Sequence, residues 1–117
     1  MSDNPLVNHE IEVTPQRTRE LLEGGDAVVV DVRETYEREA GHIEGSRHIE
    51  LERLASQAET LPRDKTIVFQ CRLGSRSAMA AQAFRASGYD AWSMAGGLQR
   101  WQDEGLPVDG GGEVADH

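Results

Sequence analysis

The chain has 117 residues, and its 21 acidic and 12 basic side chains give a net charge of −9. This length is near the commonest size of a single domain, and the acidic excess argues against nucleic acid as a partner, because phosphate backbones require a cationic surface. The single cysteine cannot form an internal disulfide, and residues 1–10 contain no apolar run typical of a signal peptide or membrane span. We therefore expect one soluble, cytoplasmic domain without membrane contact.

The first half of the chain begins with an edge strand and a capped helix. Residues 10–13 alternate polar and apolar side chains, which is typical of a short strand. Thr14 and Pro15 then predict a helix N-cap and first helical position, and glycines at 24–25 predict the end of that helix. The β-branched run at 27–32 indicates a parallel strand buried on both faces.

Strands and helices continue to alternate through the rest of the chain. We expect helices at 35–40, 51–60, 77–86 and 98–104, and strands at 48–49, 66–70 and 91–94. This alternation predicts an α/β domain with right-handed crossovers, in which ligands lie at the carboxyl ends of the strands. We place this domain at residues 10–108, between an N-terminal extension at 1–9 and a disordered, glycine-rich and acidic tail at 109–117.

The only cysteine, Cys71, follows the predicted strand 66–70 and opens a loop that leads into a helix. Such a loop turns backbone N–H groups inward and adds the positive end of a helix dipole, which favours an anion at its centre. Arg72 and Arg76 add positive charge, and partly open, electropositive surroundings favour a reactive thiolate. The alternative is a small, inert cysteine buried in the core. Loops after the strands ending near Asp31 and Met94 are expected to meet this loop in one pocket.

The number of residues between Cys71 and Arg76 limits the reactions that this loop can support. Arg76 follows Cys71 in a Cys-x4-Arg pattern, and Ser77 stands where a Cys-x5-Arg pattern would place its arginine. Cysteine phosphatases and many arsenate reductases need the longer loop to enclose a tetrahedral oxyanion. The shorter loop fits one extra sulfur atom on the cysteine better. The four histidines have no metal-ligand spacing, so we expect no metal and no cofactor.

Three segments together resemble the single-domain rhodaneses, a family of sulfurtransferases, from about Val13 to Pro107. The first is Asp31-Val32-Arg33-Glu34 followed by Glu37, Gly41-His42-Ile43, Gly45 and Ile49; the second is the loop Cys71 to Ser77; the third is Gly96-Gly97 with Trp101. The resemblance implies the three-layer rhodanese-like fold, in which helices flank both faces of a five-stranded parallel sheet.

The resemblance also implies a persulfide cycle. Cys71 would attack the sulfane sulfur of an anionic donor such as thiosulfate and keep one sulfur atom, which a thiol or cyanide then collects. The implied catalytic residues are Cys71 and Arg76, with Arg76 binding the donor or holding the loop. The rest of the active-site loop is Arg72, Leu73, Gly74, Ser75 and Ser77, of which Arg72 would recruit the donor. Asp31 and Arg33 are expected to hold the loop without meeting substrate, and His42 to belong to a structural turn.

The acceptor and two other functions stay open at this stage. Thioredoxin, glutathione or a sulfur-carrier protein would each supply an acceptor thiol. One alternative function is a rhodanese-like module that binds a partner without catalysis. The other is a small cysteine phosphatase or arsenate reductase, which the length of the loop disfavours.

Overall fold

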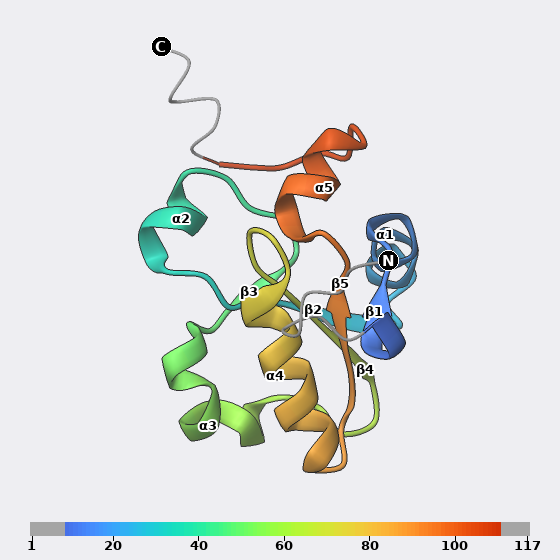
Figure 1. Cartoon of the computed structure of the whole chain (residues 1–117), viewed down its shortest axis with the longest axis vertical. Helices are drawn as coiled ribbons and strands as arrows, with labels where there is room; N and C mark the ends of the chain where they lie inside the picture. Colours follow the sequence, from blue (N-terminus) through green and yellow to red (C-terminus); the bar gives the residue numbers. More distant parts are fainter. Residues whose placement is uncertain (1–8, 111–117) are drawn as a thin grey trace.

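The computed structural model describes residues 9–110 and contains the predicted five-stranded parallel sheet (Figure 1). The strand order is β1-β5-β4-β2-β3, and every neighbouring pair is parallel. The strands are β1 (Glu12–Val13), β2 (Ala27–Asp31), β3 (Arg47–His48), β4 (Thr66–Gln70) and β5 (Asp90–Met94). The central position of β4 explains its apolar run at residues 67–69, because helices cover both of its faces.

The helices form two layers around this sheet. They are α1 (Pro15–Glu23), α2 (Thr35–Glu39), α3 (Leu54–Gln57), α4 (Ser75–Ala86) and α5 (Gly97–Asp103), with 3-10 turns η1 (His9–Ile11), η2 (Leu51–Arg53) and η3 (Ala58–Thr60). One core packs α3 and α4 against the sheet, and a second core packs α1 and α5 against its other face. Within residues 9–110, every helix is too short or too polar to cross a membrane.

The side chains of β4 alternate between the two cores. Ile67 and Phe69 enter the core beneath α4, and Cys71, the next residue of this series, belongs to the same core. Val68 enters the core on the α1 and α5 side. The period of two along a strand therefore fixes which face of the sheet Cys71 occupies.

The helix expected at 51–60 is divided into η2, α3 and η3. The hydroxyl of Ser56 donates to the carbonyl of Arg53 at 3.0 Å, and that of Thr60 donates to the carbonyl of Gln57 at 2.7 Å. Arg53 and Gln57 are the residues at the two junctions between these pieces. Side-chain hydrogen bonds of this kind compete with regular helical bonds, which accounts for the division.

Other boundaries differ by one or two residues from the expected ones. The strand expected at 48–49 is Arg47–His48, and α4 starts at Ser75 because Gly74 takes a positive φ of 113° at its N-cap. Asp109, assigned to the tail, pairs with His42: each backbone N–H donates to the other residue's carbonyl, at 2.7 and 2.9 Å. Residues 111–117 of the predicted tail, and residues 1–8 of the predicted extension, lie outside the described residues.

The turn between β5 and α5 packs directly against the loop after β4. The backbone N–H of Leu98 donates to the carbonyl of Cys71 at 2.8 Å, and that of Gln99 donates to the carbonyl of Arg72 at 3.0 Å. Gly97 lies between them with a φ of 62°, and a Cβ there would sit 2.4 Å from the Arg72 oxygen. Only glycine allows this approach.

We expect Gly97→Ala to destabilise the fold by several kcal/mol, because it adds a steric clash to an unfavourable φ. Gly105→Ala is the matched control, since Gly105 has a φ of 80° but no atom within 4 Å of its added Cβ. The control should cost roughly 1 kcal/mol, the cost of φ alone. Urea unfolding of both variants measures the difference, and equal losses would contradict the close approach.

Candidate active site

The Cys71 sulfur lies inside the loop between β4 and α4, facing its backbone amides. The N–H groups of Gly74 and Ser77 donate to Cys71 Sγ at 3.1 and 3.4 Å. These are the inward amides expected from the sequence. The expected partly open setting is wrong, however, because Cys71 is 0% exposed. Its position in line with Ile67 and Phe69 places it beneath α4, and the loop closes over it.

Two buried hydroxyls stand next to this sulfur. Ser77 Oγ lies 3.5 Å from Cys71 Sγ and donates to the carbonyl of Gly74 at 3.1 Å. Ser93 Oγ, on β5, lies 2.8 Å from Ser77 Oγ. The sequence motifs pointed to Ser77 but not to Ser93. The available signal was a hydroxyl residue within the short run 91–94, which was otherwise expected to be buried.

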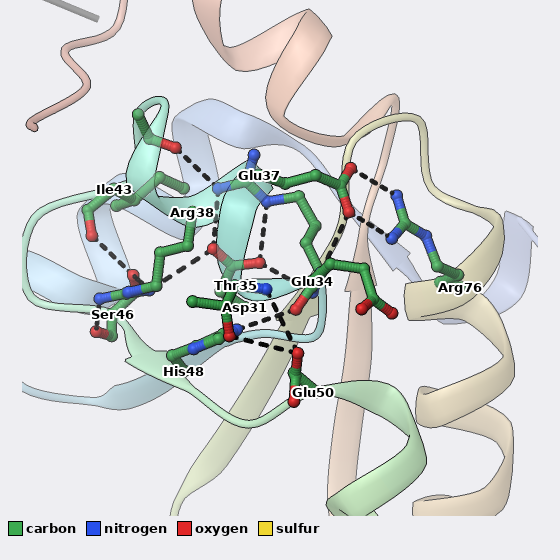
Figure 2. Close-up of polar contacts among 12 residues, drawn as sticks. Asp31, Glu34, Thr35, Glu37, Arg38, Ile43, Ser46, His48, Glu50 and Arg76 are labelled. Atoms are coloured by element: carbon green, nitrogen blue, oxygen red, sulfur yellow. Dashed lines mark hydrogen bonds and ion pairs between the residues drawn. The ribbon is translucent and has the colours of Figure 1, made fainter. Parts of the chain in front are cut away.

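Arg76 points to α2 and forms a two-pronged ion pair with Glu37 (Figure 2). Its two terminal nitrogens donate to the Glu37 carboxylate at 2.8 and 3.1 Å. The hydrogen bond from Arg76 lowers the pKa of Glu37 to about 2, with help from the backbone N–H of Glu34 and against the effect of burial. The same pair raises the pKa of Arg76 above its ordinary value. Arg76 therefore joins α4 to α2.

Asp31 and Arg33 form a buried network next to α2. The Asp31 carboxylate accepts two hydrogen bonds from the Arg33 guanidinium, at 2.9 and 2.8 Å, and one from its backbone N–H at 3.0 Å. Arg33 also donates to the carbonyl of Gly41 at 2.7 Å. Arg38 adds bonds to Asp31 at 3.4 Å and to the Ser46 carbonyl at 2.9 Å (Figure 2). These contacts brace residues 31–46 and do not touch the Cys71 side chain.

A hollow of about 270 Å³ opens beside the loop. It is lined by Arg33, Tyr36, Glu37, Ala40, Gly41, Arg72, Leu98, Gln99 and Gln102. Arg33 and Arg76 are engaged with carboxylates, whereas the Arg72 side chain has no hydrogen-bond or ion-pair partner within residues 9–110. The charge available to a visiting anion at this mouth is therefore that of Arg72. Leu73 in the loop and Tyr36 on α2 are strongly exposed, at 65% and 72%.

A search of known protein families finds that the rhodanese-like domain matches residues 14–104. The chain belongs to the rhodanese-like family. One relative is the thiosulfate sulfurtransferase GlpE of Pseudomonas aeruginosa, which is 36% identical over 91 residues covering 77% of this chain and 82% of that protein. The resemblance seen in the three sequence motifs is thereby confirmed.

Two further proteins that resemble this chain differ in length. An HTH-type transcriptional regulator of Mycobacterium tuberculosis is 38% identical over 112 residues, which cover 93% of this chain but 49% of the regulator. The crystal structure of a rhodanese-related protein from Thermoplasma volcanium is 32% identical, with a TM-score of 0.78, and the match covers 84% of this chain and 96% of that one. The chain thus matches about half of the regulator and nearly all of the protein from Thermoplasma volcanium.

The Glu37–Arg76 pair predicts a pH-dependent loss of stability. Because the pKa of Glu37 is lowered from 4.5 to about 2 in the folded protein, its contribution is complete above pH 4.5 and disappears as the pH falls through 2. Glu37→Gln should therefore cost on the order of 2 kcal/mol at neutral pH, reduced by the partial exposure of Arg76.

Urea unfolding between pH 7 and pH 2 tests this expectation, and the gap between wild type and Glu37→Gln should close below pH 4.5. Glu39→Gln, which removes a charge from an exposed position of the same helix, is the control and should show little effect at any pH. A gap of constant size down to pH 2 would contradict the pairing.

Proposed function

We propose that this rhodanese-like protein is a sulfurtransferase that carries sulfur as a persulfide on Cys71. The observation that supports the proposal is the pair of backbone N–H groups, from Gly74 and Ser77, directed at the Cys71 sulfur. Preorganised donors of this kind stabilise a sulfur anion without reorganising during the reaction. The similarity to GlpE, a thiosulfate sulfurtransferase, supports the same chemistry.

The proposed cycle has two displacements at sulfur. The Cys71 thiolate attacks the outer sulfur of thiosulfate, a new S–S bond forms, and sulfite leaves with the electron pair of the broken bond. An acceptor thiolate then attacks the outer sulfur of the persulfide. That sulfur goes to the acceptor, and the Cys71 thiolate is restored. No net oxidation of the protein occurs over the cycle, and no cofactor is needed.

Arg72 is proposed to recruit the anionic donor, and Arg76 to hold the loop. Arg76 is paired with Glu37 and Arg33 with Asp31, so each of these positive charges is already balanced by a carboxylate. Arg72 lines the hollow beside the loop, and within residues 9–110 no carboxylate pairs with it. On a protein of net charge −9, one open cation at the mouth gives a local site for a small anion.

The rim of the site favours a thiol acceptor with apolar surroundings over cyanide. Tyr36 and Leu73 expose large apolar surfaces next to Arg72. A small inorganic anion such as cyanide gains little from apolar contacts, whereas a larger acceptor can cover these surfaces. We propose a thiol carried by a protein or peptide, a class that includes thioredoxin, glutathione and sulfur-carrier proteins.

A partner-binding module without catalysis is the second candidate function. The complete burial of Cys71 favours it, since an enzyme must bring the sulfur into contact with the donor. The similarity to a transcriptional regulator, which is about twice as long as the matched region, also favours it. The phosphatase alternative stays disfavoured, because Ser77 stands where the longer loop would require arginine.

Intact mass before and after treatment with thiosulfate separates these candidates. We expect the protein to gain one sulfur atom, cyanide to remove it, and Cys71→Ser to gain nothing, because it lacks the attacking sulfur. Cys71→Ser with unchanged circular dichroism and thermal unfolding is the folding control. No gain by the wild type at any thiosulfate concentration would favour the binding module.

Steady-state kinetics test the assignment of Arg72. Arg72→Gln should raise the KM for thiosulfate about tenfold with little change in kcat, because it removes a charge that acts on donor binding. Arg17→Gln on α1 removes the same charge from an exposed site and is the control. If both variants raise KM equally, the effect is one of net charge and Arg72 has no special role.

A further inference from the structure

Ser93 is a buried polar residue that the proposed cycle does not yet use. It is 1% exposed, and its register partner on β4 is Phe69. Its side chain points to the α4 side of the sheet, where Cys71 and Ser77 also lie, among apolar side chains such as Ala80 and Ala91. A hydroxyl in such surroundings costs free energy unless it is hydrogen-bonded.

The protons of the two hydroxyls can be assigned by counting donors and acceptors. Within residues 9–110, the only hydrogen-bond partner of the Ser93 hydroxyl is Ser77 Oγ, at 2.8 Å. Ser93 must therefore donate to Ser77, because the opposite arrangement would leave the Ser93 proton unpaired in the core. The proton of Ser77 is then directed at either the Gly74 carbonyl, at 3.1 Å, or Cys71 Sγ, at 3.5 Å.

The choice between those two acceptors follows the charge on the sulfur. A neutral thiol donates its own proton to Ser77 Oγ, and the Ser77 hydroxyl stays on the Gly74 carbonyl. A sulfur anion is the stronger acceptor, so the Ser77 hydroxyl turns to it. The Gly74 carbonyl is not left unpaired by this turn, because it keeps the bond from the Ala78 N–H at 3.0 Å.

We propose that Ser93 is a positioning residue for sulfur transfer, whose hydroxyl fixes the orientation of Ser77 so that a third donor reaches the Cys71 anion. The inference rests on the proposed function and adds to it a residue on a different strand. The donation from Ser93 also polarises the Ser77 hydroxyl, since hydrogen bonds in a chain strengthen one another. Ser93 touches neither donor nor acceptor and acts only through Ser77.

The matched variants Ser93→Thr and Ser93→Val test this role, because they have nearly the same shape and differ in the hydroxyl. We expect Ser93→Val to lower kcat by about three- to tenfold with the KM for thiosulfate unchanged, and Ser93→Thr to recover most of the loss. Thermal unfolding of the two variants serves as the control for packing. Equal kcat values for the two variants, or a loss that follows thermal stability, would overturn the proposal.

A double-mutant cycle gives a second test that tolerates a general loss of stability. Because Ser93 acts through Ser77, Ser93→Ala should lower kcat in the wild type but not in a Ser77→Ala background. Additive losses would show that Ser93 acts by another route and would overturn the proposal.

A measurement without any sulfur donor separates this inference from the proposed function. The ultraviolet absorbance of the thiolate is recorded at the pH where Cys71 is ionised in half of the wild-type molecules. Ser93→Val should show a thiolate-to-thiol ratio about three- to tenfold lower than Ser93→Thr, even if no sulfur is ever transferred. Equal thiolate-to-thiol ratios in the two variants would show that Ser93 has no effect on the Cys71 anion and would overturn the inference. Unequal ratios in a protein that transfers no sulfur would overturn the proposed function but support the effect of Ser93 on Cys71.

Discussion

The loop between β4 and α4 depends on the direction in which its peptide groups are turned. The carbonyls of Cys71 and Arg72 point outward, where they accept the first amides of α5, and the N–H groups of Gly74 and Ser77 point inward to the sulfur. Within each peptide group the N–H and the carbonyl point to opposite sides, so the bonds from α5 turn the N–H groups of Arg72 and Leu73 away from α5. The contact at Gly97 therefore fixes the first two peptide groups of the loop, which lead to the inward amides of Gly74 and Ser77.

Ion pairs fix the short segments around the loop that are too short to be stable alone. Helix α2 has five residues, well below the length at which an isolated helix is stable. Asp31, Arg33 and Arg38 fasten the segment around it to β2, and the pair of Glu37 with Arg76 fastens it to α4. The Asp31–Arg33 pair is buried, so removing one of these two partners would leave an uncompensated charge. The wall of the hollow thus rests on electrostatics more than on apolar packing.

Features that repeat along the chain could be predicted from the sequence, and features set by neighbours in space could not. The buried runs at β2 and β4 and the glycine turns predicted the sheet and most boundaries, because these signals lie within single segments. The loop count is also local, since Cys71 and Arg76 belong to one segment, and it favours sulfur over phosphoryl chemistry. The partner of Arg76, in contrast, is 39 positions away, and Ser93 meets Ser77 from another strand. The burial of Cys71 was missed because polar neighbours such as Arg72 suggested exposure, whereas the strand period places its side chain inward.

The complete burial of the Cys71 side chain limits how fast its sulfur can meet another molecule. Because the Cys71 sulfur has no surface in contact with water, it meets another molecule only while the loop is displaced, and the rate of the proposed sulfur transfer is limited by that opening. The same barrier keeps peroxide and other stray oxidants away during the rest of the time. Burial of Cys71 therefore limits its contact with a sulfur donor and with oxidants alike.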